Sequence, residues 1–383
     1  MTRKEVIVRA LDGRLSWIAA ADILGITPRH MRRLKEAYER HGYGGLVDQR
    51  GRRPRRRRIP VQTIAALCRL RRERYADFSI RHFWEQATEK HGLALSYTWT
   101  RLVLQAAGLA PTLKARGTYR RKRERRPLVG MLVHLDASTH PWLAGPPPQD
   151  LVVALDDADG RILYAQFWPQ ESTASTFHAL HHVLTHYGRF AELYTDRGSH
   201  FCRTMTAGTA PDLVYDTQVQ RALKTVGIRH ILARSPQARG RSERAFGTLQ
   251  GRLPQELRVA GIADYAAANT YLQTAFVPDF NRRFTVKPTQ LGSAFLKLVG
   301  LDLRLVLSAQ HARVVRNDST VVFGPLTLQL PPTKWRPHYV RCPVLVHELP
   351  DTTLGLSHHG RLLARYDRTG RLLEVPAAKG RAA

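Results

Sequence analysis

The chain has 383 residues, of which 60 are Lys or Arg and 31 are Asp or Glu, so its formal net charge is +29. Such an excess of positive charge indicates a polyanionic partner, usually nucleic acid, and says little about the fold. The sequence shows no apolar run of about 18 residues, no signal-peptide pattern and no Cys-x-x-Cys pair, which argues against a membrane span, a disulfide framework and a structural zinc site.

Residues 1–48 are predicted to form a helix-turn-helix DNA-binding domain. Gly25 ends an apolar helical face, and Thr27 and Pro28 are favourable N-cap and first-turn residues for a second helix. This helix, 28–39, presents donors that read base edges or bind phosphates, namely Arg29, His30, Arg32, Arg33 and Lys35. A small helical hairpin with a solvated basic face is the alternative interpretation.

Two basic linkers flank a second predicted helical domain. The first linker, 49–59, cannot form a core and can lie along a DNA backbone through Arg55, Arg56, Arg57 and Arg58. Residues 60–112 contain three amphipathic segments, which we interpret as a second helical DNA-binding domain. The second linker, 113–127, contributes Arg121, Lys122 and Arg123. Runs of like charge are often only solvated, but the net charge favours DNA contact.

The pattern changes at Leu128, and residues 128–295 predict an α/β domain with a mixed sheet. A strand from Val129 to Asp136 precedes a hairpin with an Asp-Gly turn, and a later strand ends at Asp196. A helix after Gly240 is expected to break after Gln250. Residues 305–383 alternate over short runs separated by turns, which predicts a small all-β barrel. The expected protein is therefore multidomain, with an all-α N-terminal part, an α/β core and a β tail.

Three acids stand where metal chemistry would need them. Asp136 and Asp196 are each expected where the chain leaves a sheet, and Glu243 on the margin of the apolar face of a helix packed against that sheet. Two Asp and one Glu that converge can hold two Mg²⁺ ions, because hard cations prefer oxygen ligands. Each Asp taken alone is more simply a turn residue, and Glu243 taken alone is more simply an ion-pair partner. A hairpin turn fully accounts for Asp156, Asp157 and Asp159.

Three segments around these acids resemble the catalytic blocks of a DDE transposase of the retroviral-integrase, RNase H-like type, and more narrowly insertion-sequence transposases of the ISNCY group. They are 131–136 (MLVHLD), 194–198 (YTDRG) and 235–244 (SPQARGRSER). The resemblance implies that Asp136, Asp196 and Glu243 are the catalytic and metal-binding triad, with Asp136 bridging two Mg²⁺ ions for which Mn²⁺ can substitute. The step of 47 positions from Asp196 to Glu243 is longer than is common in the family, and 205–216 is interpreted as a loop insertion.

Further residues near the third block are expected to contact DNA, because arginine matches phosphate geometry. They are Gln237, Arg239, Arg241 and Arg244. His200 is a weaker candidate for phosphate contact, and His134 is interpreted as structural.

The sequence as a whole predicts a Mg²⁺-dependent DNA transposase. It would bind terminal inverted repeats, nick the element ends and join the 3′-hydroxyl to target DNA. The resemblance implies assembly as a homo-oligomer on DNA, and we expect a cytoplasmic, nucleoid-associated bacterial protein without membrane contact. Two alternatives stay open: a transposase-derived DNA-binding protein with an inactive core, and an RNase H-like nuclease without strand transfer.

Overall fold

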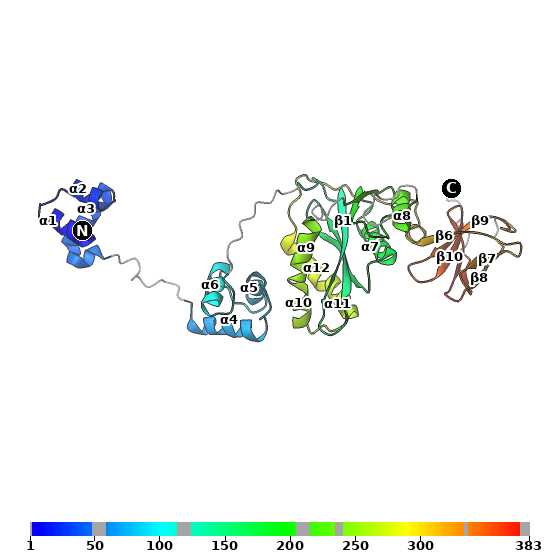
Figure 1. The fold of residues 1–383 in the computed structure, drawn as a ribbon, viewed down its shortest axis with the longest axis horizontal. Helices are drawn as coiled ribbons and strands as arrows, with labels where there is room; N and C mark the ends of the chain where they lie inside the picture. The colour runs from blue at the N-terminus through cyan, green and yellow to red at the C-terminus, as the bar shows by residue number, and fades with distance from the viewer. Residues whose placement is uncertain are drawn as a thin grey trace. The chain divides into compact units, whose positions relative to one another are not determined.

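The computed structural model describes residues 2–47, 59–112, 124–203, 215–233, 240–332 and 336–375. The chain divides into two compact units, Met1–Leu67 and Cys68–Ala383 (Figure 1). Among the described residues, none of the helices combines the length and hydropathy that crossing a bilayer requires.

The first unit begins with a small helical bundle. Its elements are α1 (Arg3–Leu11), α2 (Trp17–Ile23), α3 (Pro28–His41) and a 3₁₀ turn, η1 (Gly42–Leu46). The side chain of Thr27 accepts a hydrogen bond from the N–H of His30 at 3.3 Å and so caps α3, while Gly25 adopts φ 62 in the turn. Its core is built from Val6, Ile7, Ala10, Ala20, Ala21, Met31 and Leu34. The predicted turn chemistry of the two helices is confirmed.

Three helices follow, α4 (Val61–Glu73), α5 (Ile80–Glu89) and α6 (Tyr97–Ala106). The boundary between the two units falls within α4. Arg71 is buried, and its guanidinium donates to the carbonyl oxygens of Tyr75 and Phe78, which ties the end of α4 to the start of α5. Ser79 and Ser96 cap α5 and α6 through their hydroxyl groups. Residues 80–106 are therefore held in place by local side-chain hydrogen bonds.

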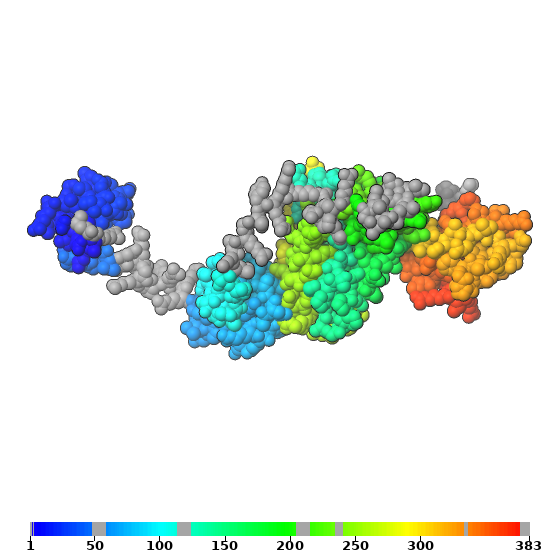
Figure 2. All heavy atoms as spheres, in the orientation of Figure 1, coloured from blue at the N-terminus to red at the C-terminus, as the bar shows by residue number. Residues whose placement is uncertain are grey.

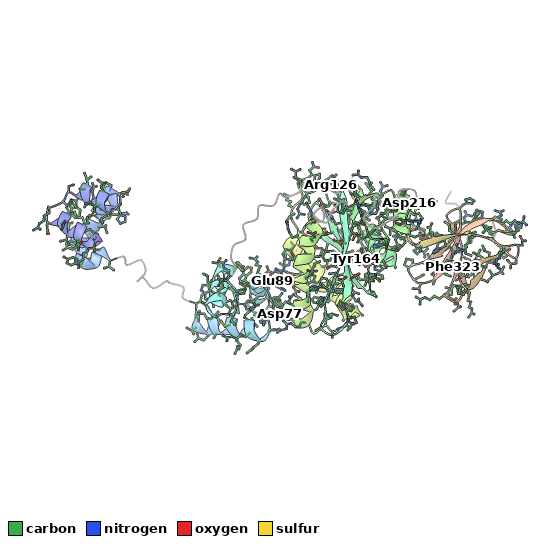
Figure 3. All side chains as sticks on the ribbon, viewed as in Figure 1. Asp77, Glu89, Arg126, Tyr164, Asp216 and Phe323 are labelled. Atoms are coloured by element: carbon green, nitrogen blue, oxygen red, sulfur yellow. The ribbon has the colours of Figure 1, made fainter. Side chains whose placement is uncertain are left out.

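The helices α5 and α10 (Leu253–Val259) meet through a buried polar interface within the second unit. In Figure 2 the blue-to-cyan surface of the segment that contains α5 adjoins the yellow-green surface of the core helices. His82 is fully buried, and its Nε2 lies 2.8 Å from Glu256 Oε1. Arg252 Nη1 donates to Glu85 Oε2 at 2.7 Å. At the exposed margin, Arg258 pairs with Asp77 and Arg283 with Glu89, and Figure 3 labels both acids where the helices meet the core. We call these contacts the α5–α10 interface.

A five-stranded mixed sheet forms the centre of the second unit. Its strands are β1 (Leu132–His140), β2 (Gln149–Asp156), β3 (Ile162–Trp168), β4 (Glu192–Thr195) and β5 (Arg229–Leu232). The spatial order is β3-β2-β1-β4-β5, with β1, β2 and β3 antiparallel and β1, β4 and β5 parallel. This arrangement is that of the RNase H-like core expected from the sequence.

Helices cover both faces of this sheet, as Figure 1 shows. On one face α7 (Thr173–His186) and α8 (Gln218–Val226) pack against Val133 and Leu135. On the other face α9 (Gly240–Gln250) packs with α10 against Leu151 and Val153 of β2. This second layer is completed by α11 (Tyr265–Tyr271), a π-helical turn, η3 (Leu272–Phe276), and α12 (Val277–Phe284). The break predicted after Gln250 is confirmed, because α9 ends there.

The C-terminal part is built from strands, but the expected barrel is not shown. A short helix, α13 (Leu303–Val306), precedes β6 (Ala309–Val314), β7 (Thr320–Phe323), β8 (Leu326–Gln329), β9 (Pro343–Glu348), β10 (Leu354–His358), β11 (Arg361–Tyr366) and β12 (Leu372–Glu374). In the described residues these strands form an open sheet, β12-β11-β10-β9-β6, and a separate β7-β8 hairpin. The two sheets share one core, so alternation in the sequence correctly indicated strands but did not determine their closure.

Candidate active site

Asp136 lies in the middle of β1, and the prediction that it ends this strand was wrong. The strand continues to His140 because β2 pairs with it along its whole length, from Val133↔Asp156 to His140↔Gln149. The parallel partner β4 is shorter and ends at Thr195. Asp136 therefore sits just beyond the point where β1 loses its parallel neighbour. It is buried, with 8 % of its surface exposed.

The sheet register brings Asp136 and Asp196 to equivalent positions on neighbouring strands. The last parallel pair is His134↔Tyr194, and each aspartate comes two residues after its member of that pair. Continued by two residues, this register puts Asp136 and Asp196 at neighbouring positions about 4.8 Å apart, and because residues two apart point to the same face of a strand, we expect the two carboxylates on one face. Asp196 Oδ1 accepts the N–H of Gly198 at 2.8 Å, which orients its carboxylate as the chain leaves β4.

Glu243 lies in the first turn of α9, on the same face of the sheet as Asp136. Asp136 pairs with Val153 in β1–β2, and Val153 shares a core with Phe246 and Leu249 of α9. Helix α9 also contacts β1 directly. Glu243 is exposed and lies on the same side of α9 as Gln250, seven residues later, whose side chain donates to Ser138 Oγ of β1 at 2.9 Å. The side of α9 that carries Glu243 therefore faces β1.

Asp157 is a fourth acid near this site. The hairpin turn expected from the sequence explains its position in the chain but not its contacts with His134 and Arg241. It is fully buried, and its Oδ1 accepts from His134 Nε2 at 2.8 Å and lies 3.1 Å from Arg241 Nε. Its Oδ2 accepts the backbone N–H of Arg126 at 2.7 Å. Burial by itself would raise the pKa of Asp157, but these hydrogen bonds and the charge of Arg241 hold that pKa below its ordinary value.

Two neighbouring acids of the hairpin have structural roles. Asp156 accepts the N–H groups of Gly130 and Ala158, at 2.7 and 2.8 Å, and burial raises its pKa to about 6. Asp159 accepts the N–H of Arg161 at 2.8 Å and is close to the guanidinium of the same residue. Both placements agree with the turn interpretation.

His200 lies beside Asp196, across Gly198. A Cβ on Gly198 would lie 3.1 Å from His200 Cε1 and 3.2 Å from Asp196 Oδ1, so a side chain here would require one of these groups to shift slightly. The imidazole Nε2 of His200 lies 3.6 Å from Glu171 Oε1. This geometry is therefore compatible with contact between His200 and a DNA phosphate bound near Asp196.

The donor chemistry at the Asp136 and Asp196 pair fits a hard divalent cation, because both side chains offer carboxylate oxygens at one sheet edge. Within the ranges that the structure describes, no group of three or more His, Cys, Asp or Glu side chains is arranged to hold a metal ion. Glu243 therefore stays a predicted third ligand, and the segment 234–239 that leads into its helix lies outside the described residues.

The predicted DNA-contacting residues fall into three groups. On α3, Arg29, His30, Arg32 and Arg33 are exposed, whereas Lys35 is half-buried, with its Nζ 5.3 Å from the Trp17 ring centre and 3.6 Å from Glu39 Oε1. On α9, Arg244 is exposed, but Arg241 is engaged with Asp157. The others lie outside the described residues, namely Arg55, Arg56, Arg57, Arg58, Arg121, Lys122, Arg123, Gln237 and Arg239.

Known proteins resemble this chain over most of its length. Residues 2–55 match a model described as a helix-turn-helix domain. A putative transposase of Sinorhizobium fredii is 33% identical over 326 residues, which cover 84% of this chain and 71% of that protein. The transposase for insertion sequence IS1202 of Streptococcus pneumoniae is 29% identical over 360 residues, covering 82% of this chain and 76% of that protein.

Solved structures give a weaker comparison. The HTLV-2 integrase catalytic core domain in complex with magnesium, in its dimeric form, aligns with 43% of this chain and 95% of that chain at 16% identity, with a TM-score of 0.32. A simian T-cell lymphotropic virus intasome in complex with a PP2A regulatory subunit aligns with 70% of this chain and 91% of that chain at 15% identity, with a TM-score of 0.35.

Proposed function

Because this chain belongs to the insertion-sequence transposase family, we propose that it cuts the ends of a mobile element and joins them to target DNA. The observation that supports the proposal is the register of β1 and β4, whose last parallel pair, His134↔Tyr194, lies two residues before Asp136 and Asp196. Glu243 would approach from α9, which packs on that face. We propose these three residues as the catalytic and metal-binding triad.

The residues of the site would act on phosphates and on the attacking oxygen. Asp136, Asp196 and Glu243 would hold two Mg²⁺ ions, with Mn²⁺ as a substitute. Bound in this way, the ions would activate the attacking oxygen and stabilise the leaving oxygen of a phosphodiester. Asp136, as the more buried of the two aspartates, would be oriented by the N–H of Ala137, which donates to its Oδ1 at 2.9 Å. Arg244 would contact the phosphate backbone near the cut.

The helical parts of the chain would bind the DNA. In α3 the exposed cations would enter a major groove at a terminal inverted repeat, as the second helix of a helix-turn-helix does. The basic segments 49–59 and 113–127 would follow the backbone, which makes binding strongly dependent on salt. A homo-oligomer would then hold two element ends and the target DNA together.

The test is the substitution Asp136→Asn in the full-length protein. It keeps the shape of the side chain but removes the charge that holds a cation, so nicking and joining should fall to background while binding to terminal DNA persists. Nicking is measured on labelled element ends with Mg²⁺, and binding by gel shift. Full activity of this variant would refute the proposal.

The two alternatives are outcomes of the same experiments. A wild-type protein that binds element ends but shows no metal-dependent nicking would be a DNA-binding protein with an inactive core. Strand transfer from a pre-cut end separates a transposase from a nuclease, because a nuclease would nick the intact end but would not join the pre-cut one.

A further inference from the structure

One cluster of side chains contains the residue that lies two positions before each proposed catalytic acid. His134 precedes Asp136, Tyr194 precedes Asp196, and Arg241 precedes Glu243. The rings of His134 and Tyr194 are 5.2 Å apart between centroids, so the two strands are in contact just before their aspartates. Asp157 contacts both His134 and Arg241. One carboxylate therefore joins the strand and the helix that carry the acids.

The contacts of Asp157 fix the start of α9 against β1. Arg241 Nη1 donates to the backbone oxygen of Asp157 at 2.8 Å, while its Nε lies 3.1 Å from the carboxylate of the same residue. Asp157 is in turn fixed to β1, because its N–H donates to the carbonyl of Leu132 at 2.9 Å and its carboxylate accepts from His134. Arg241 thus makes a two-point contact with a residue that cannot move independently of the sheet.

A second contact fixes the other end of α9. Gln250 Nε2 donates to Ser138 Oγ at 2.9 Å. From His134 to Ser138 the strand rises about 13 Å, at roughly 3.3 Å per residue. From Arg241 to Gln250 the helix rises about 13.5 Å, at 1.5 Å per residue. Helix α9 is therefore tied to β1 at both ends, through Asp157 at Arg241 and directly at Gln250, with Asp136 between these contacts on the strand and Glu243 between them on the helix.

The surroundings of Asp157 favour an ion pair with Arg241. Asp157 is fully buried, and its two carboxylate oxygens contact an imidazole, a guanidinium and a backbone N–H. Removing one member of a buried ion pair leaves an uncompensated charge, which costs more than the pair contributes. The cluster therefore holds one geometry.

We propose that Asp157, acting through Arg241 and His134, is a positioning residue that sets the distance of Glu243 from Asp136 and Asp196. This inference rests on the proposed function of the three acids. It assigns to Arg241 an anchoring role in place of the DNA contact expected from the sequence. It also gives a reason for the burial of His134 in the central strand, two residues before Asp136.

The experiment compares Arg241→Gln with Arg161→Gln in the full-length protein. Arg161 pairs with Asp159 at 3.4 Å in the same hairpin, so it is a control for the loss of one Arg–Asp pair. Strand transfer from a pre-cut end is measured against Mg²⁺ concentration, with gel shift and thermal unfolding alongside. Arg241→Gln avoids the fully buried Asp157, whose substitution risks misfolding.

We expect Arg241→Gln to lower the rate tenfold to a hundredfold, on the order of the loss that an ångström of misplacement causes, and to raise the Mg²⁺ concentration for half-maximal rate several-fold. Arg241→Lys, which keeps the charge but not the two-point contact, should recover part of the rate. Arg161→Gln should match wild type in Mg²⁺ dependence. Binding to terminal DNA should be unchanged in all three.

Two results would overturn the inference. One is an Arg241→Gln protein with wild-type rate and Mg²⁺ dependence, whatever its melting temperature. The other is weaker DNA binding with unchanged Mg²⁺ dependence, which would return Arg241 to the role of a DNA contact. If Asp136→Asn abolishes activity while Arg241→Gln behaves like the control, only the positioning role fails; if Asp136→Asn is active, the proposed function itself fails.

Discussion

The substitution Glu85→Ala tests whether the α5–α10 interface holds the second helical segment on the core built around β1–β5. Glu85 is buried and accepts from Arg252 Nη1 at 2.7 Å and from Arg81 Nε at 2.9 Å, with Arg283 at 3.5 Å. Burial alone would raise the pKa of Glu85, but the hydrogen bond and charge of Arg252 lead the contacts that hold this pKa below its ordinary value. The carboxylate is therefore charged at neutral pH.

The expected magnitude follows from what the substitution leaves behind. Only about a tenth of the Arg252 side chain is exposed, so without Glu85 a buried guanidinium loses its main counter-charge. Removing one partner of a buried pair typically costs about 3–5 kcal/mol. At about 1.4 kcal/mol per factor of ten, the fraction of molecules with this interface open should rise by roughly 10² to 4 × 10³-fold.

Amide hydrogen exchange on the full-length protein measures this opening directly. Exchange in α5 and α10 should become faster by that factor in Glu85→Ala, while the strands β1 and β2 keep their protection. Asp77→Ala is the matched control at the same interface. Its pair with Arg258 is 2.6 Å long but about half exposed on both sides, so its loss should cost less than about 1 kcal/mol.

Two results would refute this reasoning. Equal acceleration in the two variants would mean that burial does not decide which pair holds the interface. A change of less than about fivefold in Glu85→Ala would mean that Arg252 finds another partner or reaches water at little cost.

Two further predictions concern the core and the site. The pKa of Asp156 is raised from its ordinary value of 3.8 to about 6, so the folded state binds a proton that the unfolded state has released. Its stability contribution is fully present below about pH 3.8 and is lost, by about 3 kcal/mol in total, as pH rises through about 6. Urea unfolding from about pH 3 to pH 7 should show that loss in wild type relative to Asp156→Asn, and a difference that does not vary with pH would contradict it. Gly198→Ala should push the Asp196 carboxylate or the His200 ring from its place and lower nicking about tenfold or more, with binding to terminal DNA unchanged in gel shift. A variant with the wild-type nicking rate would show that the neighbouring side chains adjust freely.

Local signals in the sequence predicted the elements well. Thr27 and Ser96 were identifiable as N-caps because capping depends on residues three positions away. Glu243 was placed correctly at the start of a helix because Pro and Gly precede a run with helical spacing. Asp196 was placed correctly at the end of its strand for a similar reason, since Arg-Gly follows it.

Features that depend on distant partners were not predictable. The strand β1 continues past Asp136 through polar residues, because pairing with β2, and not apolar alternation, sustains it there. Asp157 was interpreted only as a turn residue because its partners His134 and Arg241 are 23 and 84 positions away in the sequence. The open sheet of the C-terminal part likewise depends on which strands pair, which alternation cannot specify.

The α5–α10 interface would fix the distance between the second helical segment and Asp136. Buried charged side chains attach α5 to the core, and α6 contacts α5, so we expect the distance from α6 to Asp136 to stay constant. A duplex bound by that segment would then be cut at a fixed number of base pairs from the bound site. In Glu85→Ala the cleavage positions should therefore become more widely distributed before the rate of cleavage falls.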